Sequence, residues 1–124
     1  FKWITPRSIV RKSLENVYAA PEKVTEDLVT QYYELSCRAG NREAFVIRMN
    51  QGFATDTWKR IPTIQHPTLI LWGVEDRLIP LENAYRFAKD LPNDTLVVLP
   101  AVGHVPMEEA PQLSARAIAP FILK

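Results

Sequence analysis

Two short apolar runs, at residues 68–72 and 95–99, constrain the fold of this chain more than any other feature. Each run is continuous and brief, which is typical of a strand buried on both faces of a sheet. Between them, apolar residues over 84–91 recur at helical spacing. A strand, a helix and a second strand in this order predict a parallel pair joined by a right-handed crossover.

The end of the chain continues this alternation. Apolar residues from Leu113 to Ile122 predict a last helix that begins near Pro111, with Pro120 expected to kink or fray it. Two parallel strands are too few for a stable sheet, since such strands need cover on both faces and neighbours at their edges. We therefore expect residues 65–124 to form a β-α-β-α unit at the edge of a larger sheet.

The first part of the chain, residues 1–64, reads as helical instead. Apolar residues recur at helical spacing, and residues that cap or end helices separate the groups. The predicted helices begin at or near Thr5, Thr25 and Asn41, and they end before Pro21, Gly40 and Gly52. Several of them are apolar over more than one stripe, so we expect them to contact more than each other.

Composition narrows the classes of partner and compartment. The 15 Lys and Arg residues nearly balance the 14 Asp and Glu residues, so no net field attracts nucleic acid or an anionic membrane. No apolar run approaches the ~20 residues of a membrane span, and the first residues lack the pattern of a signal peptide. The single Cys37 is expected to be a small buried hydrophobe. The absence of an internal disulfide fits a reducing compartment, so we expect a cytoplasmic protein.

A carboxylate and a histidine follow the two predicted strands. Asp76 lies in the turn after the first strand, and His104 follows the second. The carboxyl ends of parallel strands meet at one edge of a sheet, where ligands bind in open α/β folds. An acid and a base held together there suit acyl transfer. Asp76 and His104 are therefore the candidate catalytic residues, and the sequence names no substrate-binding residue.

Neighbouring polar residues have simpler interpretations. Glu75 competes with Asp76 for the role of the acid, although a solvated or ion-paired side chain is the more ordinary reading, and Asp76 itself could be a turn residue. Glu109 is expected to complement the dipole of the last helix. Arg77 is expected at the surface, although it could contact a substrate carboxylate, and His66 is expected to be structural. Cysteine and histidine are too few for a structural zinc site, and no glycine loop could cradle a phosphate, so no metal or other cofactor is predicted.

Two segments resemble a known family. Residues 72–80, WGVEDRLIP, resemble the W-G-x-x-D-x-x-x-P element after the seventh strand of the α/β-hydrolase fold. Residues 103–111, GHVPMEEAP, resemble the G-H-x-P-x-x-E-x-P element after the eighth strand. The resemblance implies an α/β chain: the end of a helical cap over 1–64, then the C-terminal β-α-β-α part of the core over 65–124. It also implies that Asp76 is the acid and His104 the base of a catalytic triad.

The third member of such a triad has no counterpart here. In this family the nucleophile precedes the acid in a G-x-S-x-G turn between a strand and a helix. The glycines are Gly40, Gly52, Gly73 and Gly103, and no two of them have that spacing. No serine follows a predicted strand at a suitable position. We therefore predict a C-terminal fragment of a serine-type hydrolase of esters, amides or C–C bonds in small molecules, inactive alone.

Two alternatives stay open. The same acid and histidine elements occur in epoxide hydrolases and haloalkane dehalogenases, where an aspartate is the nucleophile and the histidine activates water. The chain could also be a non-catalytic interaction module. In every case the strand at 68–72 is expected to expose an edge that pairs with a second copy or with a missing N-terminal half.

Overall fold

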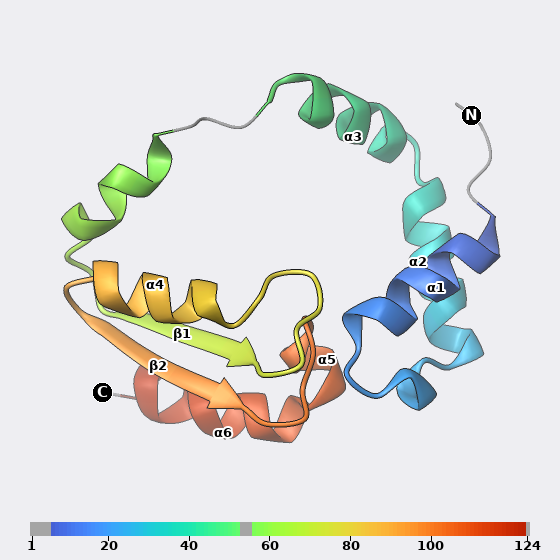
Figure 1. Ribbon diagram of the computed structural model, residues 1–124. Helices are drawn as coiled ribbons and strands as arrows, with labels where there is room; N and C mark the ends of the chain where they lie inside the picture. The colour runs from blue at the N-terminus through green and yellow to red at the C-terminus, as the bar shows by residue number, and fades with distance from the viewer. Residues whose placement is uncertain (1–5, 53–55, 124) are drawn as a thin grey trace.

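The computed structural model describes residues 6–52 and 56–123. The chain folds into helices followed by an α/β unit (Figure 1). The helical part contains α1 (Arg7–Val17), the 3₁₀ helix η1 (Pro21–Lys23), α2 (Glu26–Cys37), α3 (Asn41–Asn50) and the 3₁₀ helix η2 (Thr57–Thr63). The α/β unit contains β1 (Thr68–Gly73), α4 (Glu82–Asp90), β2 (Asp94–Leu99), α5 (Pro106–Glu109) and α6 (Pro111–Ile122).

The sheet has the predicted parallel topology. β1 pairs with β2 in a register that runs from Thr68 opposite Asp94 to Gly73 opposite Leu99. α4 packs on one face of the pair and α6 lies on the other (Figure 1). Ile70, Ala84 and Leu91 form the buried centre of this unit. The predicted α/β class, with a two-stranded parallel sheet after a helical segment, is therefore confirmed.

One expectation about the strands is wrong. β1 was predicted to be buried on both faces, yet only Ile70 and Gly73 of this strand are buried. Within the described residues, β1 pairs with β2 alone, so its other edge has no strand partner. The apolar run therefore suits a more buried environment than the described part of the chain provides.

A second core forms where α1 and α2 cross beyond the carboxyl ends of the strands (Figure 1). It is built from Leu14, Tyr18, Val24 and Val29. The predicted cap of α2 is confirmed, because the Thr25 hydroxyl accepts the Leu28 N–H at 3.2 Å. This second core places the α1–α2 pair beside the loops that follow the strands.

Several local expectations need correction. α1 ends at Val17 rather than just before Pro21, because the next residues turn to meet the α/β unit. The proposed cap at Thr5 lies outside the described residues. Cys37 is exposed rather than buried. On α3, Phe45 is 66 % exposed, and no residue of that helix is buried.

The C-terminal helices follow the prediction with one addition. α6 begins at Pro111 as expected, and it continues to Ile122 with Pro120 inside its last turn. The short α5 was not predicted; its first residue, Pro106, has the fixed φ that suits a helix start. No helix in the described part of the chain combines the length and apolar character that crossing a membrane requires. The division of the chain at residue 64 stays a prediction.

Candidate active site

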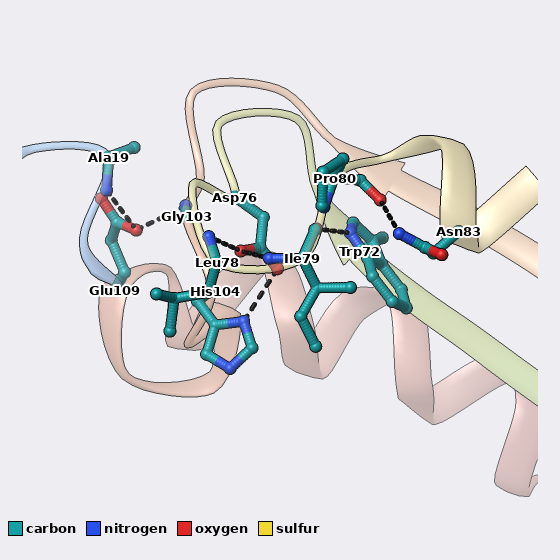
Figure 2. A network of polar contacts seen from close by, with 10 residues as sticks. All are labelled: Ala19, Trp72, Asp76, Leu78, Ile79, Pro80, Asn83, Gly103, His104 and Glu109. Carbon is teal, nitrogen blue, oxygen red and sulfur yellow. Dashed lines mark hydrogen bonds and ion pairs between the residues drawn. The ribbon is translucent and has the colours of Figure 1, made fainter. Parts of the chain in front are cut away.

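The structure brings Asp76 and His104 together. Asp76 lies in the loop after β1 and His104 in the loop after β2, and Asp76 Oδ2 is 2.8 Å from His104 Nδ1 (Figure 2). The Asp76 side chain is 5 % exposed and that of His104 is 32 % exposed. The acid is therefore shielded, while the histidine ring reaches solvent.

Backbone groups hold the Asp76 carboxylate in place. Its Oδ1 accepts the N–H groups of Leu78 and Ile79, each at 2.9 Å. Burial raises the pKa of Asp76, but the bonds from Ile79, His104 and Leu78 outweigh it and hold the pKa below its usual value. The group is thus an ionised acceptor at neutral pH. A proton on His104 Nδ1 donates to it, which leaves the Nε2 lone pair to accept a proton.

Glycine at 103 is required by a close backbone approach. A Cβ at Gly103 would lie 2.6 Å from the Ala19 nitrogen and closer still to the Val17 oxygen. Positive φ is found among the described glycines only at Gly40 and Gly52. Glycine at 103 therefore serves the close contact with the segment after α1 rather than a positive φ.

We predict that Gly103→Ala destabilises the protein by at least about 1–3 kcal/mol, because backbone atoms must move to admit the methyl group. Denaturant unfolding measures the loss. Gly52→Ala is the comparison, because a Cβ there meets no atom within 4 Å and carries only the strain of a φ of +66°. A smaller loss for Gly103→Ala than for Gly52→Ala would contradict the close approach.

Residues Val17 to Ala20, called the 17–20 segment below, connect α1 to η1 and contact both loops. The His104 N–H donates to the Val17 oxygen at 2.8 Å. Arg77, next to Asp76, donates to the carbonyls of Tyr18 at 3.2 Å and Ala19 at 3.3 Å, and also to Glu15 at 3.3 Å. Arg77 is exposed, as expected, and its guanidinium also anchors this segment.

Glu109, in α5 after the His104 loop, binds the same segment. Its carboxylate accepts the N–H of Gly103 at 2.7 Å, of Ala19 at 3.1 Å and of Ala20 at 2.9 Å (Figure 2, which draws the first two). The residue is 5 % exposed. Sequence reasoning assigned Glu109 to a helix dipole, whereas its partners are loop amides. The only sequence signal that singled out Glu109 was its position in the motif of residues 103–111.

Its neighbour Glu108 makes a separate cluster. The hydroxyls of Tyr18 and Tyr32 donate to Glu108 at 2.9 and 2.7 Å. Burial, followed by the bond to Glu108, raises the pKa of Tyr32 to about 12 and raises that of Tyr18 further. Tyr33 instead packs against the Arg7 guanidinium, 5.4 Å from its ring centre. A hollow of about 400 Å³ beside the cluster is lined by Tyr18, Lys23, Thr25, Leu28, Gln31 and Glu108.

The remaining candidates lie apart from this pair. Glu75 is exposed, and it is Asp76 that contacts His104. His66 is exposed before β1. Trp72 donates its Nε1–H to the Ile79 oxygen at 3.2 Å, which fixes the end of the acid loop. Over residues 6–52 and 56–123, no three His, Cys, Asp or Glu side chains gather as metal ligands would.

Residues 2–111 match the model of a family described as the alpha/beta hydrolase fold. An uncharacterized hydrolase of Bacillus subtilis (strain 168), YugF, is 31% identical over 126 residues, which cover 98% of this chain and 44% of that protein. A 2-hydroxy-6-oxononadienedioate/2-hydroxy-6-oxononatrienedioate hydrolase of a Pseudomonas species is 31% identical over 97 residues, covering 77% of this chain and 34% of that protein.

A solved structure gives the same picture. The crystal structure of a serine hydrolase involved in carbazole degradation, the CarC enzyme, matches with a TM-score of 0.85 and 25% identity. The match covers 98% of this chain and 48% of that one. The chain therefore spans less than half the length of the proteins that it resembles.

Proposed function

Because the chain belongs to the α/β-hydrolase fold family, we propose that it is the acid-and-base part of a hydrolase that acts on small molecules. The observation that carries the proposal is the 2.8 Å contact between Asp76 Oδ2 and His104 Nδ1, formed by loops that follow adjacent parallel strands. The partly exposed His104 ring supports it, because a general base must reach the proton that it removes.

The mechanism follows from the geometry of the pair. His104 Nε2 would take the proton of a nucleophile and later return it to the leaving group. Asp76, ionised and fixed by two backbone N–H groups, would stabilise the imidazolium that forms. A serine is the nucleophile that we propose, supplied from outside these 124 residues. The chain alone is then inactive, since such groups act as a unit.

For the substrate we propose a carbonyl compound cleaved at a C–C bond. Support comes from relatives named as hydrolases of 2-hydroxy-6-oxo acids and from a structural neighbour named as a serine hydrolase. Water would be consumed as the bond beside the oxo carbon breaks. That carbon becomes a carboxylic acid, and the leaving carbon gains a proton. His104 is placed to deliver this proton after activating the nucleophile.

An assay of the full-length gene product tests this function. C–C bond cleavage is measured by the loss of the dienoate absorbance of a 2-hydroxy-6-oxo-dienoic acid. Ester hydrolysis is measured by the release of nitrophenol from short acyl esters, and the two rates are compared. Faster cleavage of the oxo acid supports the proposal; preference for esters would move the substrate to that class. An aspartate at the upstream elbow would contradict the serine mechanism, and absence of all hydrolysis would contradict the function.

We also propose a pairing role for the outer edge of β1. A hollow of about 340 Å³ runs along this strand, lined by Ile61, Ile64, Thr68, Leu69, Ile70, Leu71, Trp72, Phe87 and Leu91. Its apolar lining and the absence of a second partner for β1 among the described residues support a strand from the N-terminal part of the full-length protein as its occupant. In isolation the 124-residue chain would pair with copies of itself.

Analytical ultracentrifugation of the isolated chain tests the pairing. We expect its average mass to rise with concentration, and Ile64→Glu to shift it towards the monomer because a charge then lies in the apolar hollow. Ile122→Glu is the matched control, since Ile122 is 71% exposed at the end of α6 and should leave association unchanged. A monomer at every concentration would contradict the proposal.

A further inference from the structure

The 17–20 segment lies between the loops that carry the acid and the base, and it is bonded to both. On the base side, the two peptide groups that flank Gly103 are fixed. The Gly103 N–H donates to Glu109 at 2.7 Å, and the His104 N–H donates to the Val17 oxygen at 2.8 Å. On the acid side, Arg77 binds the segment's carbonyls.

We propose that Glu109 is a positioning residue for His104: its buried carboxylate ties Gly103 to the 17–20 segment and so sets how the imidazole meets Asp76. The inference rests on the proposed function, because a positioned base matters only to a protein that uses it. Glu109 touches no reacting atom in this scheme. It acts through the backbone of Gly103.

Burial and charge support this role. A residue that is only 5 % exposed can hold an ionised carboxylate at low cost only if hydrogen bonds replace the lost water. Three loop N–H groups donate such bonds to the Glu109 carboxylate. Burial raises the pKa of Glu109, but the bonds from Gly103, Ala20 and Ala19 outweigh it and lower the pKa overall. Charge-assisted bonds of this kind are short and directional. The ionised Glu109 carboxylate therefore fixes the position of Gly103 relative to the 17–20 segment more tightly than an uncharged side chain would.

The geometry also separates Glu109 from Glu108. Both belong to α5, yet the Glu108 carboxylate binds the hydroxyls of Tyr18 and Tyr32 and makes no bond to the backbone of residues 103 and 104 among the contacts described. Glu109 alone of the two reaches Gly103. The pair thus offers adjacent, isosteric substitutions that differ in their connection to the histidine loop.

Glu109→Gln in the full-length protein tests the inference. The amide replaces one acceptor oxygen with an NH₂ donor. This donor faces a backbone N–H, so at least one hydrogen bond to the loop is lost. We expect kcat to fall by up to about 100-fold, the loss that a misplaced catalytic group can cause, with KM changed less than about twofold. The low-field NMR signal of the His104 Nδ1 proton, assigned by its absence from His104→Ala, should shift or broaden. Glu108→Gln should leave kcat and this signal unchanged.

The outcomes separate the two proposals. If the unmodified protein hydrolyses nothing, the function fails, and the Nδ1 proton signal still tests whether Glu109 positions the ring. If Glu109→Gln keeps both the kcat and the signal of the unmodified protein, positioning is overturned while the function stands. Equal losses in Glu108→Gln would also overturn it. Should Glu109→Gln not fold, Glu109→Asp keeps the charge on a shorter side chain. It should lower kcat and move the signal, and unchanged values there would overturn the inference.

Discussion

His104→Ala is expected to reduce kcat of the full-length protein by about 10⁴- to 10⁶-fold, the range found when the base of a serine-hydrolase triad is removed. The reason is that His104 supplies the imidazole that contacts Asp76, at 2.8 Å, and no other described residue is placed to act as the base in the proposed mechanism. Substrate affinity, measured by equilibrium binding to the variant, should stay within severalfold, because the imidazole acts in the chemical step.

His66→Ala is the matched control for that loss. His66 is exposed, and its described contact is made by its backbone oxygen, which accepts the Thr68 hydroxyl at 3.0 Å. Replacing the His66 ring should leave kcat unchanged. Turnover near the unmodified rate in His104→Ala would remove the base from the proposed mechanism.

Asp76→Asn is expected to lower kcat by about 10⁴-fold through the wrong histidine tautomer, as in other triads. The backbone decides which way the new amide points. Oδ1 accepts the N–H groups of Leu78 and Ile79, both at 2.9 Å, so the amide oxygen must take that position. The amide NH₂ then faces His104 Nδ1, which has to accept a bond, and the ring proton moves to Nε2.

Glu75→Gln separates the acid role from general charge loss. Glu75 adjoins Asp76 and is exposed, and it was the competing candidate for the acid. Steady-state kinetics should show unchanged kcat in Glu75→Gln and a large loss in Asp76→Asn. The reverse pattern would transfer the role to Glu75, and full activity in both would place the acid elsewhere.

The sequence predicted the parts of the fold that depend on neighbouring residues. The apolar runs at 68–72 and 95–99 matched β1 and β2, and the helical spacing between them matched α4. Thr25 was correctly assigned as a cap because capping joins residues three positions apart. The contact between Asp76 and His104 could be anticipated because parallel strands end at the same edge of a sheet.

What sequence reasoning missed depends on distant contacts. Arg77 bonds residues about 60 positions earlier, and Glu109 bonds Ala19 and Ala20 about 90 positions earlier. No local pattern records such pairs. The partial exposure of β1 was also missed, because an apolar run reports the environment that a strand suits rather than the neighbours present.

The contacts of the 17–20 segment bear on how the length of this chain can vary. Its carbonyls face the guanidinium of Arg77, and its N–H groups face the carboxylate of Glu109. An inserted or deleted residue there would shift donors and acceptors relative to both partners at once. The turn at 38–40, between α2 and α3, is exposed. Among its described contacts, its backbone is not held between a guanidinium and a carboxylate in this way. We therefore expect length changes to be tolerated at that turn and not in the short connection after α1.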